Sequence, residues 1–210
     1  MTPLRGGFTM DAALHQYFAG QVRVPSVTEM LRDAGLIDDR WFREEHAERG
    51  RVIHDLAARL DLGVALDEAQ RVDAARYVGY LSAYEETRDL LGPIYSHVEE
   101  MALRRDLGFA GTPDRLGTGT RSYPDRDFVL DLKTGAPRGW HGVQLALYDI
   151  LATSPLTESR RRIGLYVTAK GTGRVKVYSD PKDYRQARAI LRDHSLARAA
   201  QEERSCRSER

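Results

Sequence analysis

The sequence predicts an α/β fold in which a central mixed β-sheet is flanked by helices, with a helical lobe on its N-terminal side. Helical spacing dominates the first ninety residues, whereas short strand-like segments separated by Gly, Asp and Pro follow Gly92-Pro93. An amphipathic helical segment then interrupts the strands, which is typical of a mixed α/β domain. We expect one domain with a polar tail: residues 1–196, divided into a helical lobe (1–91) and an α/β core (92–196), and then 197–210.

Three helices are expected in the N-terminal lobe. Ser26 and Glu29 form a capping-box pattern, in which each side chain satisfies a free backbone N–H, and this pattern opens a helix through Leu36. A third helix is expected over about 67–91. Between them, residues 40–61 are expected to form a helix because apolar residues recur at helical spacing, at Ile53, Leu56, Ala57 and Leu60.

The C-terminal part is expected to alternate strands with two helices. Strand-like segments are at 94–104, 108–116 and 127–133, and a hairpin is expected to join 163–169 to 174–178. A helix is expected over 140–152. Asp180-Pro181 then begins a last helix that ends near Leu196, because proline suits the first helical position.

Composition excludes several classes of protein. Lysine and arginine number 32 against 31 acidic residues, so nucleic-acid binding would need a local basic surface and not overall charge. The single cysteine, Cys206, excludes an internal disulfide framework and a four-cysteine zinc or iron–sulfur site. No segment approaches ~18 consecutive apolar residues, and the first twenty contain no apolar signal segment. We therefore expect a soluble cytoplasmic protein that does not bind membranes.

The strongest chemical signal lies in the segment 127–133. Alternation along a strand places Asp131 and Lys133 on the same face. Asp114 ends the preceding strand-like segment, so pairing of the two strands would bring both carboxylates together. At about 4 Å and an effective dielectric of about 20, they would repel by about 4 kcal/mol. A hard divalent cation such as Mg²⁺ or Mn²⁺ would relieve this repulsion, and Lys133 beside it could orient or deprotonate water.

These residues resemble the signature of the PD-(D/E)XK nuclease superfamily. Pro113-Asp114 is followed, after sixteen residues, by Asp131-Leu132-Lys133. An ordered set of further segments resembles the RecB-like branch: Arg49-Gly-Arg-Val-Ile-His54, Val98-Glu99 before Gly108-Phe-Ala-Gly-Thr-Pro-Asp114, Asp131-Leu-Lys-Thr-Gly135 and Gln144-Leu-Ala-Leu-Tyr148. Pro25-Ser-Val-Thr28 resembles the opening of phage exonucleases and of the mitochondrial genome maintenance exonuclease. The resemblance implies a PD-(D/E)XK nuclease core.

The resemblance implies a role for each residue of the signature. Asp114 and Asp131 would be catalytic and would hold the metal together with the carbonyl of Leu132. Lys133 would be the catalytic base that activates water or stabilises the transition state. His54 would be an imidazole ligand on the neighbouring helix. Asp114 could instead be a turn residue, Asp131 and Lys133 could form a surface ion pair on an edge strand, and His54 could be a core histidine.

Three further residues complete the implied site. Glu99 would be another metal ligand, directly or through water, although Glu100 is an alternative because a one-residue shift exchanges the two faces of a strand. Gln144 and Tyr148, one helical turn apart, would bind the substrate by positioning Lys133 and the DNA backbone. Gln144 could instead be a cap, and Tyr148 could be a core aromatic residue.

The resemblance implies a metal-dependent DNA exonuclease that uses Mg²⁺ or Mn²⁺. Its substrates would be single-stranded DNA or DNA ends in phage or prophage recombination, replication or repair, with a partner protein of those pathways, in a bacterial or phage-infected cell. The chain lacks the four cysteines of related cluster-containing nucleases, so no iron–sulfur cluster is expected. Two alternatives remain: a structure-specific endonuclease or nickase, and a nuclease-derived module that binds DNA without cutting it.

Overall fold

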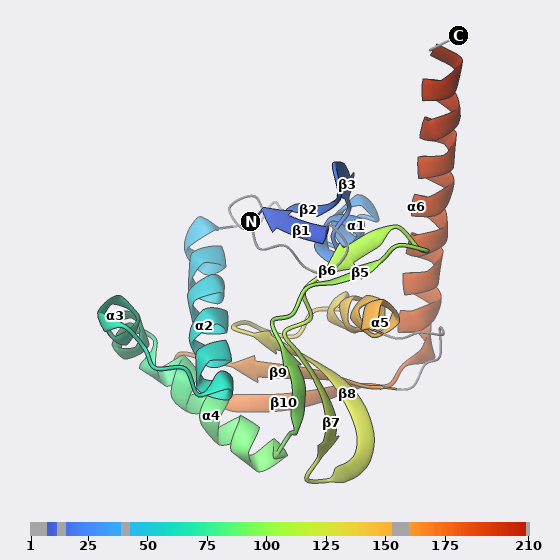
Figure 1. The fold of residues 1–210 in the computed structure, drawn as a ribbon. Helices are drawn as coiled ribbons and strands as arrows, with labels where there is room; N and C mark the ends of the chain where they lie inside the picture. Colours follow the sequence, from blue (N-terminus) through green and yellow to red (C-terminus); the bar gives the residue numbers. More distant parts are fainter. Residues whose placement is uncertain (1–7, 12–15, 39–42, 153–159, 209–210) are drawn as a thin grey trace.

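The fold is mixed α/β around a five-stranded central sheet, as the sequence predicts (Figure 1). The computed structural model describes residues 8–11, 16–38, 43–152 and 160–208. Among the described strands of this sheet, β8 and β9 pair in parallel and the other neighbours pair antiparallel. The strands lie in the order β10 (Gly173–Tyr178), β9 (Arg161–Val167), β8 (Tyr123–Lys133), β7 (Arg115–Thr120) and β4 (Tyr95–Val98).

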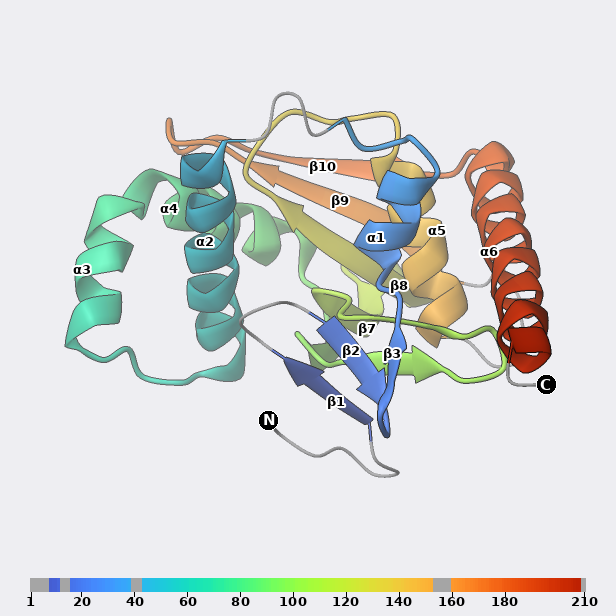
Figure 2. The same cartoon turned by 90° about the horizontal axis from the view of Figure 1, so that it is seen from above.

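Helices cover both faces of this sheet (Figures 1 and 2). On one face lie α1 (Val27–Asp33), α5 (His141–Ala152) and α6 (Pro181–Ser208). The other face is covered by α2 (Glu44–Leu62) and α4 (Val78–Leu91), and α3 (Glu68–Arg76) packs against these two helices. The alternation predicted for β8 is confirmed, because Val129 packs on the α5 side and Phe128, Leu130 and Leu132 pack on the α2 side.

The prediction that the first ninety residues are helical is wrong for residues 8–11 and 16–24. These residues form an antiparallel sheet of β1 (Phe8–Asp11), β2 (Gln16–Ala19) and β3 (Val22–Val24). Gly20 adopts φ 66° in the two-residue turn between β2 and β3, a conformation that glycine adopts without strain. Apolar residues at alternate positions bury one face of the sheet, so the period is two and not that of a helix.

Two helix boundaries also differ from the prediction. The helix expected over 67–91 is divided into α3 and α4 at Tyr77, where α4 turns to lie directly against the β9–β10 hairpin. The last helix continues past Leu196 to Ser208, because residues 197–205 are mostly good helix formers and include neither Gly nor Pro. The capping box of Ser26 and Glu29 is present at α1. The expected start of the second helix, at residue 40, lies outside the described residues.

The strands expected over 94–104 and 108–116 are each divided between two sheets. Their outer parts, β5 (Ala102–Arg104) and β6 (Phe109–Gly111), form a separate two-stranded sheet. The first division occurs at Glu99, which adopts φ 50° and so turns the chain away from β4. The second occurs at Pro113, which has no N–H to donate to a strand neighbour. Both divisions lie beside the candidate functional residues.

Two helical glycines are expected to respond to alanine in opposite directions. A Cβ at Gly79 of α4 would lie 2.1 Å from the carbonyl oxygen of Ala169, whereas a Cβ at Gly50 of α2 would have only the Thr134 hydroxyl nearby, at 3.9 Å. Gly50→Ala should therefore stabilise the protein by about 0.5–1 kcal/mol through helix propensity. Gly79→Ala should destabilise it by about 1–3 kcal/mol through steric overlap. Urea denaturation measures both, and equal stabilisation by the two substitutions would contradict the close packing of α4.

A buried histidine joins α5 to the sheet. The Nδ1 atom of His141 lies 2.8 Å from the hydroxyl of Tyr166, which in turn contacts the hydroxyl of Tyr178. The same Nδ1 atom accepts a hydrogen bond from the backbone N–H of Arg138 at 3.3 Å. Burial, together with the positive charges of Lys133, Arg138 and Lys176, lowers the pKa of His141 to about 3. The imidazole is therefore neutral at ordinary pH.

This neutral histidine predicts a loss of stability in acid. The unfolded chain binds a proton at His141 below pH 6.5 whereas the folded protein does not, so stability falls as the pH decreases from 6.5 towards 3. The contribution reaches at most about 1.4 kcal/mol per pH unit. His141→Asn keeps an acceptor near the Nδ1 position without titrating, so its unfolding free energy should fall less steeply in urea denaturation at a series of pH values. Identical slopes for the variant and the wild type would contradict the prediction.

Candidate functional site

The candidate site lies where β7 and β8 meet the turn after β4. Antiparallel pairing aligns Arg115 with Leu130, which places Asp114 next to Asp131 as the sequence predicts for paired strands. The side chain of Asp114 turns back to accept a hydrogen bond from the N–H of Leu132 at 2.7 Å. The carbonyl oxygen of Asp114 accepts another from the N–H of Glu99 at 2.9 Å. These bonds fix the positions of two carboxylates relative to the central strand.

His54, Glu99 and Asp114 form a compact cluster of possible metal ligands. One ligand atom from each residue lies within 4.8 Å of those of the other two. The Nδ1 atom of His54 on α2 is 3.4 Å from Oδ2 of Asp114 and 3.6 Å from Oε1 of Glu99. Asp114 is buried, whereas the side chains of His54 and Glu99 keep 27% and 31% of their surfaces exposed. The cluster is therefore accessible from solvent on one side.

The charges in this cluster favour a cation between the carboxylates. Burial lowers the pKa of His54, but Asp114 and Glu99 outweigh this effect and raise it to about 10. Burial and the charge of Asp114 raise the pKa of Glu99. Burial also raises the pKa of Asp114, but the positive charges of His54 and Lys133 outweigh it and hold that pKa below its usual range. One imidazole and two carboxylates are a donor set that fits a divalent cation, which would replace the proton on His54.

Asp131 and Lys133 lie beside this cluster and contact each other. The Nζ atom of Lys133 is 2.5 Å from Oδ2 of Asp131. Asp131 is buried in the middle of the sheet, between β7 and β9, and not on an edge strand. Burial raises its pKa to about 6, although the charge of Lys133 acts in the opposite direction. Lys133 also lies 5.7 Å from the ring centre of Trp140. A surface ion pair on an edge strand, the alternative interpretation of these two residues, is therefore wrong.

The remaining predicted residues occupy different environments. Glu99 joins the cluster of ligands, whereas the side chain of Glu100 is 63% exposed and lies 3.9 Å from His97. Gln144 and Tyr148 are buried on α5, and Tyr148 packs against Gly111. The Oε1 atom of Gln144 has no hydrogen-bond partner among the described residues. An unpaired buried acceptor is rare, so this atom is available to a donor from outside the chain.

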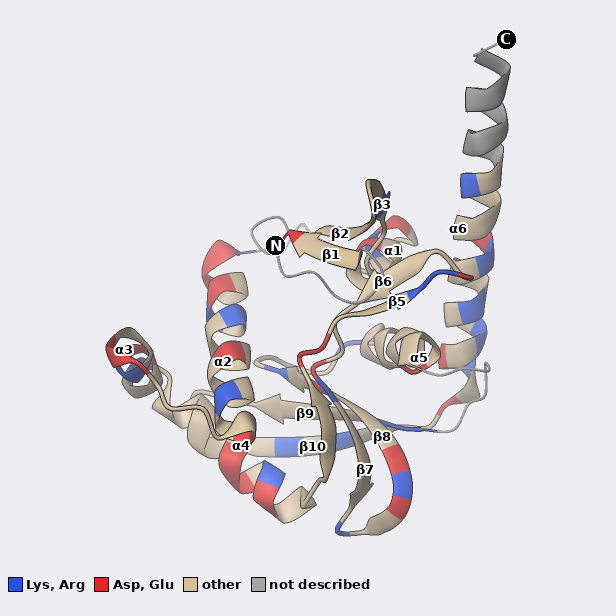
Figure 3. Ribbon diagram, in the orientation of Figure 1, with Lys and Arg blue, Asp and Glu red and all other residues tan. Residues whose placement is uncertain are grey.

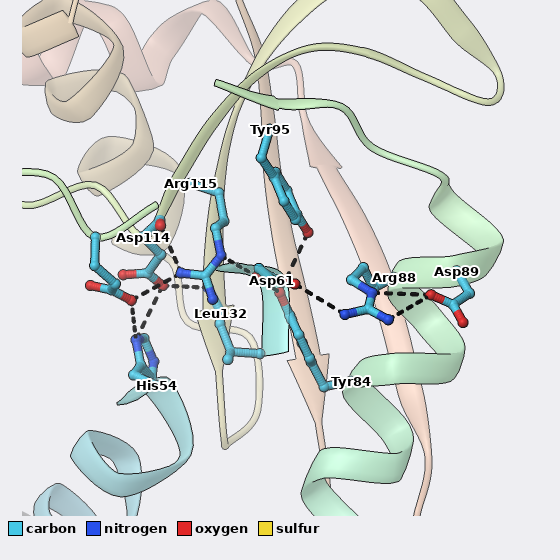
Figure 4. A network of polar contacts seen from close by, with 10 residues as sticks. His54, Asp61, Tyr84, Arg88, Asp89, Tyr95, Asp114, Arg115 and Leu132 are labelled. Atoms are coloured by element: carbon cyan, nitrogen blue, oxygen red, sulfur yellow. Dashed lines mark hydrogen bonds and ion pairs between the residues drawn. The ribbon is translucent and has the colours of Figure 1, made fainter. Parts of the chain in front are cut away.

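Behind the cluster lies a buried ion pair between Arg115 and Asp61 that the sequence does not predict (Figure 4). The guanidinium of Arg115 donates to Glu99 Oε1 at 3.0 Å and to the carbonyl of Asp114 at 2.7 Å. Its Nε atom donates to Asp61 of α2 at 2.6 Å. The side chains of Arg115 and Asp61 are 1% and 0% exposed. Arg115 follows the Asp114 of the signature directly, but no pattern in the sequence indicates that an arginine is buried there.

Two more side chains complete the contacts of Asp61. The hydroxyl of Tyr84 donates to it at 2.5 Å, and Arg88 donates to it at 3.1 Å (Figure 4). The rings of Tyr84 and Tyr95 face the guanidinium of Arg115, with ring centres 6.0 and 5.9 Å from its central carbon. The network therefore connects α2 and α4 with the strand that carries the candidate site.

The chain is similar to known proteins in structure but not in sequence. No protein-family model matches the chain, and no curated protein matches it in sequence. The structure is similar to the crystal structure of a candidate exonuclease from Eubacterium rectale, with a TM-score of 0.44 and 9% identity over 80% of this chain and 77% of that chain. It is also similar to SSO0001, with a TM-score of 0.33 and 15% identity over 81% and 84%. Likenesses of this size do not establish a family.

None of the helices in the described part of the chain is long and apolar enough to span a membrane.

Replacing Arg115 should lower the free energy of unfolding more than replacing an exposed arginine. Arg115→Met leaves Asp61 buried without its ionic partner on β7, which should lower the free energy of unfolding by about 3–5 kcal/mol. Arg51→Met is the matched control, because Arg51 pairs with Glu44 on the exposed surface of α2, and it should cost less than about 1 kcal/mol. Urea denaturation measures both. Equal effects of the two substitutions would contradict the structural importance of the buried pair.

Proposed function

We propose that this protein is a metal-dependent nuclease of the PD-(D/E)XK type that hydrolyses phosphodiester bonds in DNA. One observation supports this most directly: the cluster of His54, Glu99 and Asp114 lies next to the paired side chains of Asp131 and Lys133 at the end of the central strands. A divalent-cation site beside a lysine and a buried carboxylate is suited to an anionic phosphodiester and to the activation of water.

In this proposal the cation is held by His54, Glu99 and Asp114, with Asp131 and the carbonyl of Leu132 as further ligands. Mg²⁺ or Mn²⁺ would neutralise charge on the phosphate and lower the pKa of water. Lys133 would orient or deprotonate the attacking water and stabilise the developing charge on the phosphate.

Two residues of α5 would position the substrate beside this centre. The free acceptor of Gln144 supports a contact with a donor on the substrate or with water. Burial raises the pKa of Tyr148 well above its ordinary value, so its hydroxyl would act as a neutral donor. The two residues would thus align the DNA backbone and Lys133.

An exonuclease is the proposed form of the activity because Pro25-Ser-Val-Thr28 resembles the opening of phage exonucleases. Single-stranded DNA or DNA ends would be its substrates, in recombination, replication or repair of phage or prophage DNA. An endonuclease or nickase has the same chemistry and differs in the substrates that reach the site. A DNA-binding module without catalysis would need no intact Lys133.

A nuclease assay with matched variants tests this proposal. End-labelled single strands, linear duplex and closed circular DNA are incubated with Mg²⁺, Mn²⁺ or EDTA. Asp114→Ala and Lys133→Ala should each reduce cleavage of linear DNA by at least about 100-fold, because each removes a group that acts on the reacting phosphate. Asp125→Ala and Lys182→Ala are the controls, since both residues are exposed and outside the site, and they should retain activity.

The pattern of products distinguishes the alternatives. Metal-dependent loss of linear DNA with intact circles is the expected result. Cut circles would replace the exonuclease with an endonuclease or nickase. DNA binding without any product, at every metal and with correctly folded protein, would overturn the enzymatic proposal in favour of a binding module.

A further inference from the structure

Basic side chains extend from the candidate site across the sheet to its edge strand. We use the term row for three of them, which lie beyond Lys133: Arg138, Arg174 and Lys176. The register aligns Lys133 of β8 with Tyr166 of β9, and Tyr166 with Arg174 of β10. One step along the same face, Asp131 aligns with Gly164, which aligns with Lys176. Since neighbouring strands are about 4.8 Å apart, Arg174 lies about 10 Å from Lys133 in the backbone. The row therefore lies beside the candidate site.

The side chains of this row share the face that carries Asp131 and Lys133. Tyr178 and Tyr166 belong to the core on the α5 side, and alternation along β10 puts Arg174 and Lys176 on that side as well. The Nζ atom of Lys176 lies 4.4 Å from the ring centre of Tyr178, whose hydroxyl contacts that of Tyr166. Figure 3 shows basic segments on β10 and no acidic segment on this strand.

A third cation, Arg138, joins the row from the loop before α5. Its backbone N–H contacts His141, which bonds to Tyr166 in the middle of the row. Arg138 and Arg174 are exposed, and Lys176 is half-buried. None of the three side chains pairs with a carboxylate among the described residues, unlike Lys133, which contacts Asp131. Burial is the largest cause of the lowered pKa of His141, and the positive charges of Lys133, Arg138 and Lys176 lower it further, so these cations lie close enough to act on one imidazole.

We propose that Arg138, Arg174 and Lys176 bind the phosphodiester backbone of the same nucleic-acid strand whose scissile phosphate lies at the metal cluster. This inference rests on the proposed function and adds the direction of the strand, from Lys133 over Tyr166 towards β10. Cations without acidic partners attract phosphates, and contacts of this kind hold nucleic acid without reading its sequence. The three residues would supply the local basic surface that a net charge of +1 does not provide.

Two triple variants with the same change in charge test this proposal. Arg138→Gln/Arg174→Gln/Lys176→Gln removes the row. Arg126→Gln/Lys182→Gln/Arg192→Gln removes three cations elsewhere, on the far half of β8 and on α6. Binding of a short labelled single-stranded oligonucleotide is measured by fluorescence anisotropy in EDTA at several salt concentrations. Hydrolysis of the oligonucleotide and of bis(p-nitrophenyl) phosphate, a phosphodiester too small to reach the row, is measured with Mn²⁺.

The row variant should bind the oligonucleotide at least about tenfold more weakly. The slope of the logarithm of its binding constant against the logarithm of the salt concentration should become less steep by up to about 2, as the loss of three phosphate contacts predicts for a single strand. Its hydrolysis of bis(p-nitrophenyl) phosphate should equal that of the wild type, because the metal cluster is untouched. Wild-type binding by the row variant, equal weakening by both triple variants, or loss of the small-substrate activity would overturn the proposal. A wild-type protein that neither binds nor hydrolyses DNA would instead overturn the proposed function itself.

Discussion

The candidate site depends on one buried interaction, the ion pair between Arg115 and Asp61. Two charges that are almost fully excluded from solvent are stable only when each makes further hydrogen bonds. Arg115 meets this requirement by donating to Glu99 and to the carbonyl of Asp114, and Asp61 meets it by accepting from Tyr84 and Arg88. The groups that satisfy the buried arginine are thus the backbone and side chain of two proposed metal ligands. The contacts that hold the helices on the sheet are therefore the same contacts that position the proposed ligands.

This arrangement also explains how one small domain can hold carboxylates close together. Glu99 and Asp114 repel each other, and the cluster balances their charges with Arg115 behind them and His54 in front. The two balancing cations differ in accessibility, because Arg115 is enclosed by aromatic rings whereas His54 faces solvent. Only the charge on His54 can be exchanged without unfolding the core. A divalent ion would therefore replace the proton on His54 and leave the charge of Arg115 in place.

The sequence predicts the sheet, its flanking helices and the pairing of the strands that carry Asp114 and Asp131, because alternation and capping are local patterns. It does not predict the N-terminal sheet, because its strands are too short for a two-residue alternation of apolar side chains to be recognised. It also does not predict the division of the strands at Glu99 and Pro113. Arg115 is missed for a different reason. Arginine is normally exposed, and its burial follows from Asp61, which is distant in sequence and reaches it only when α2 packs on the sheet. The roles of the site residues remain proposals.

Glu99 shows what such a site implies for the evolution of the chain. A non-glycine residue at φ 50° costs roughly 1–2 kcal/mol, and glycine at this position would remove that cost. The carboxylate, however, contributes to the cluster and accepts a hydrogen bond from the buried arginine, so keeping it there requires a strained backbone conformation. Selection for stability alone therefore acts on Glu99 in two directions, because glycine would relax the backbone but would leave the buried guanidinium of Arg115 without one of its acceptors. A replacement of Glu99 would then be tolerated best together with a change at Arg115, so the two positions should vary as a pair.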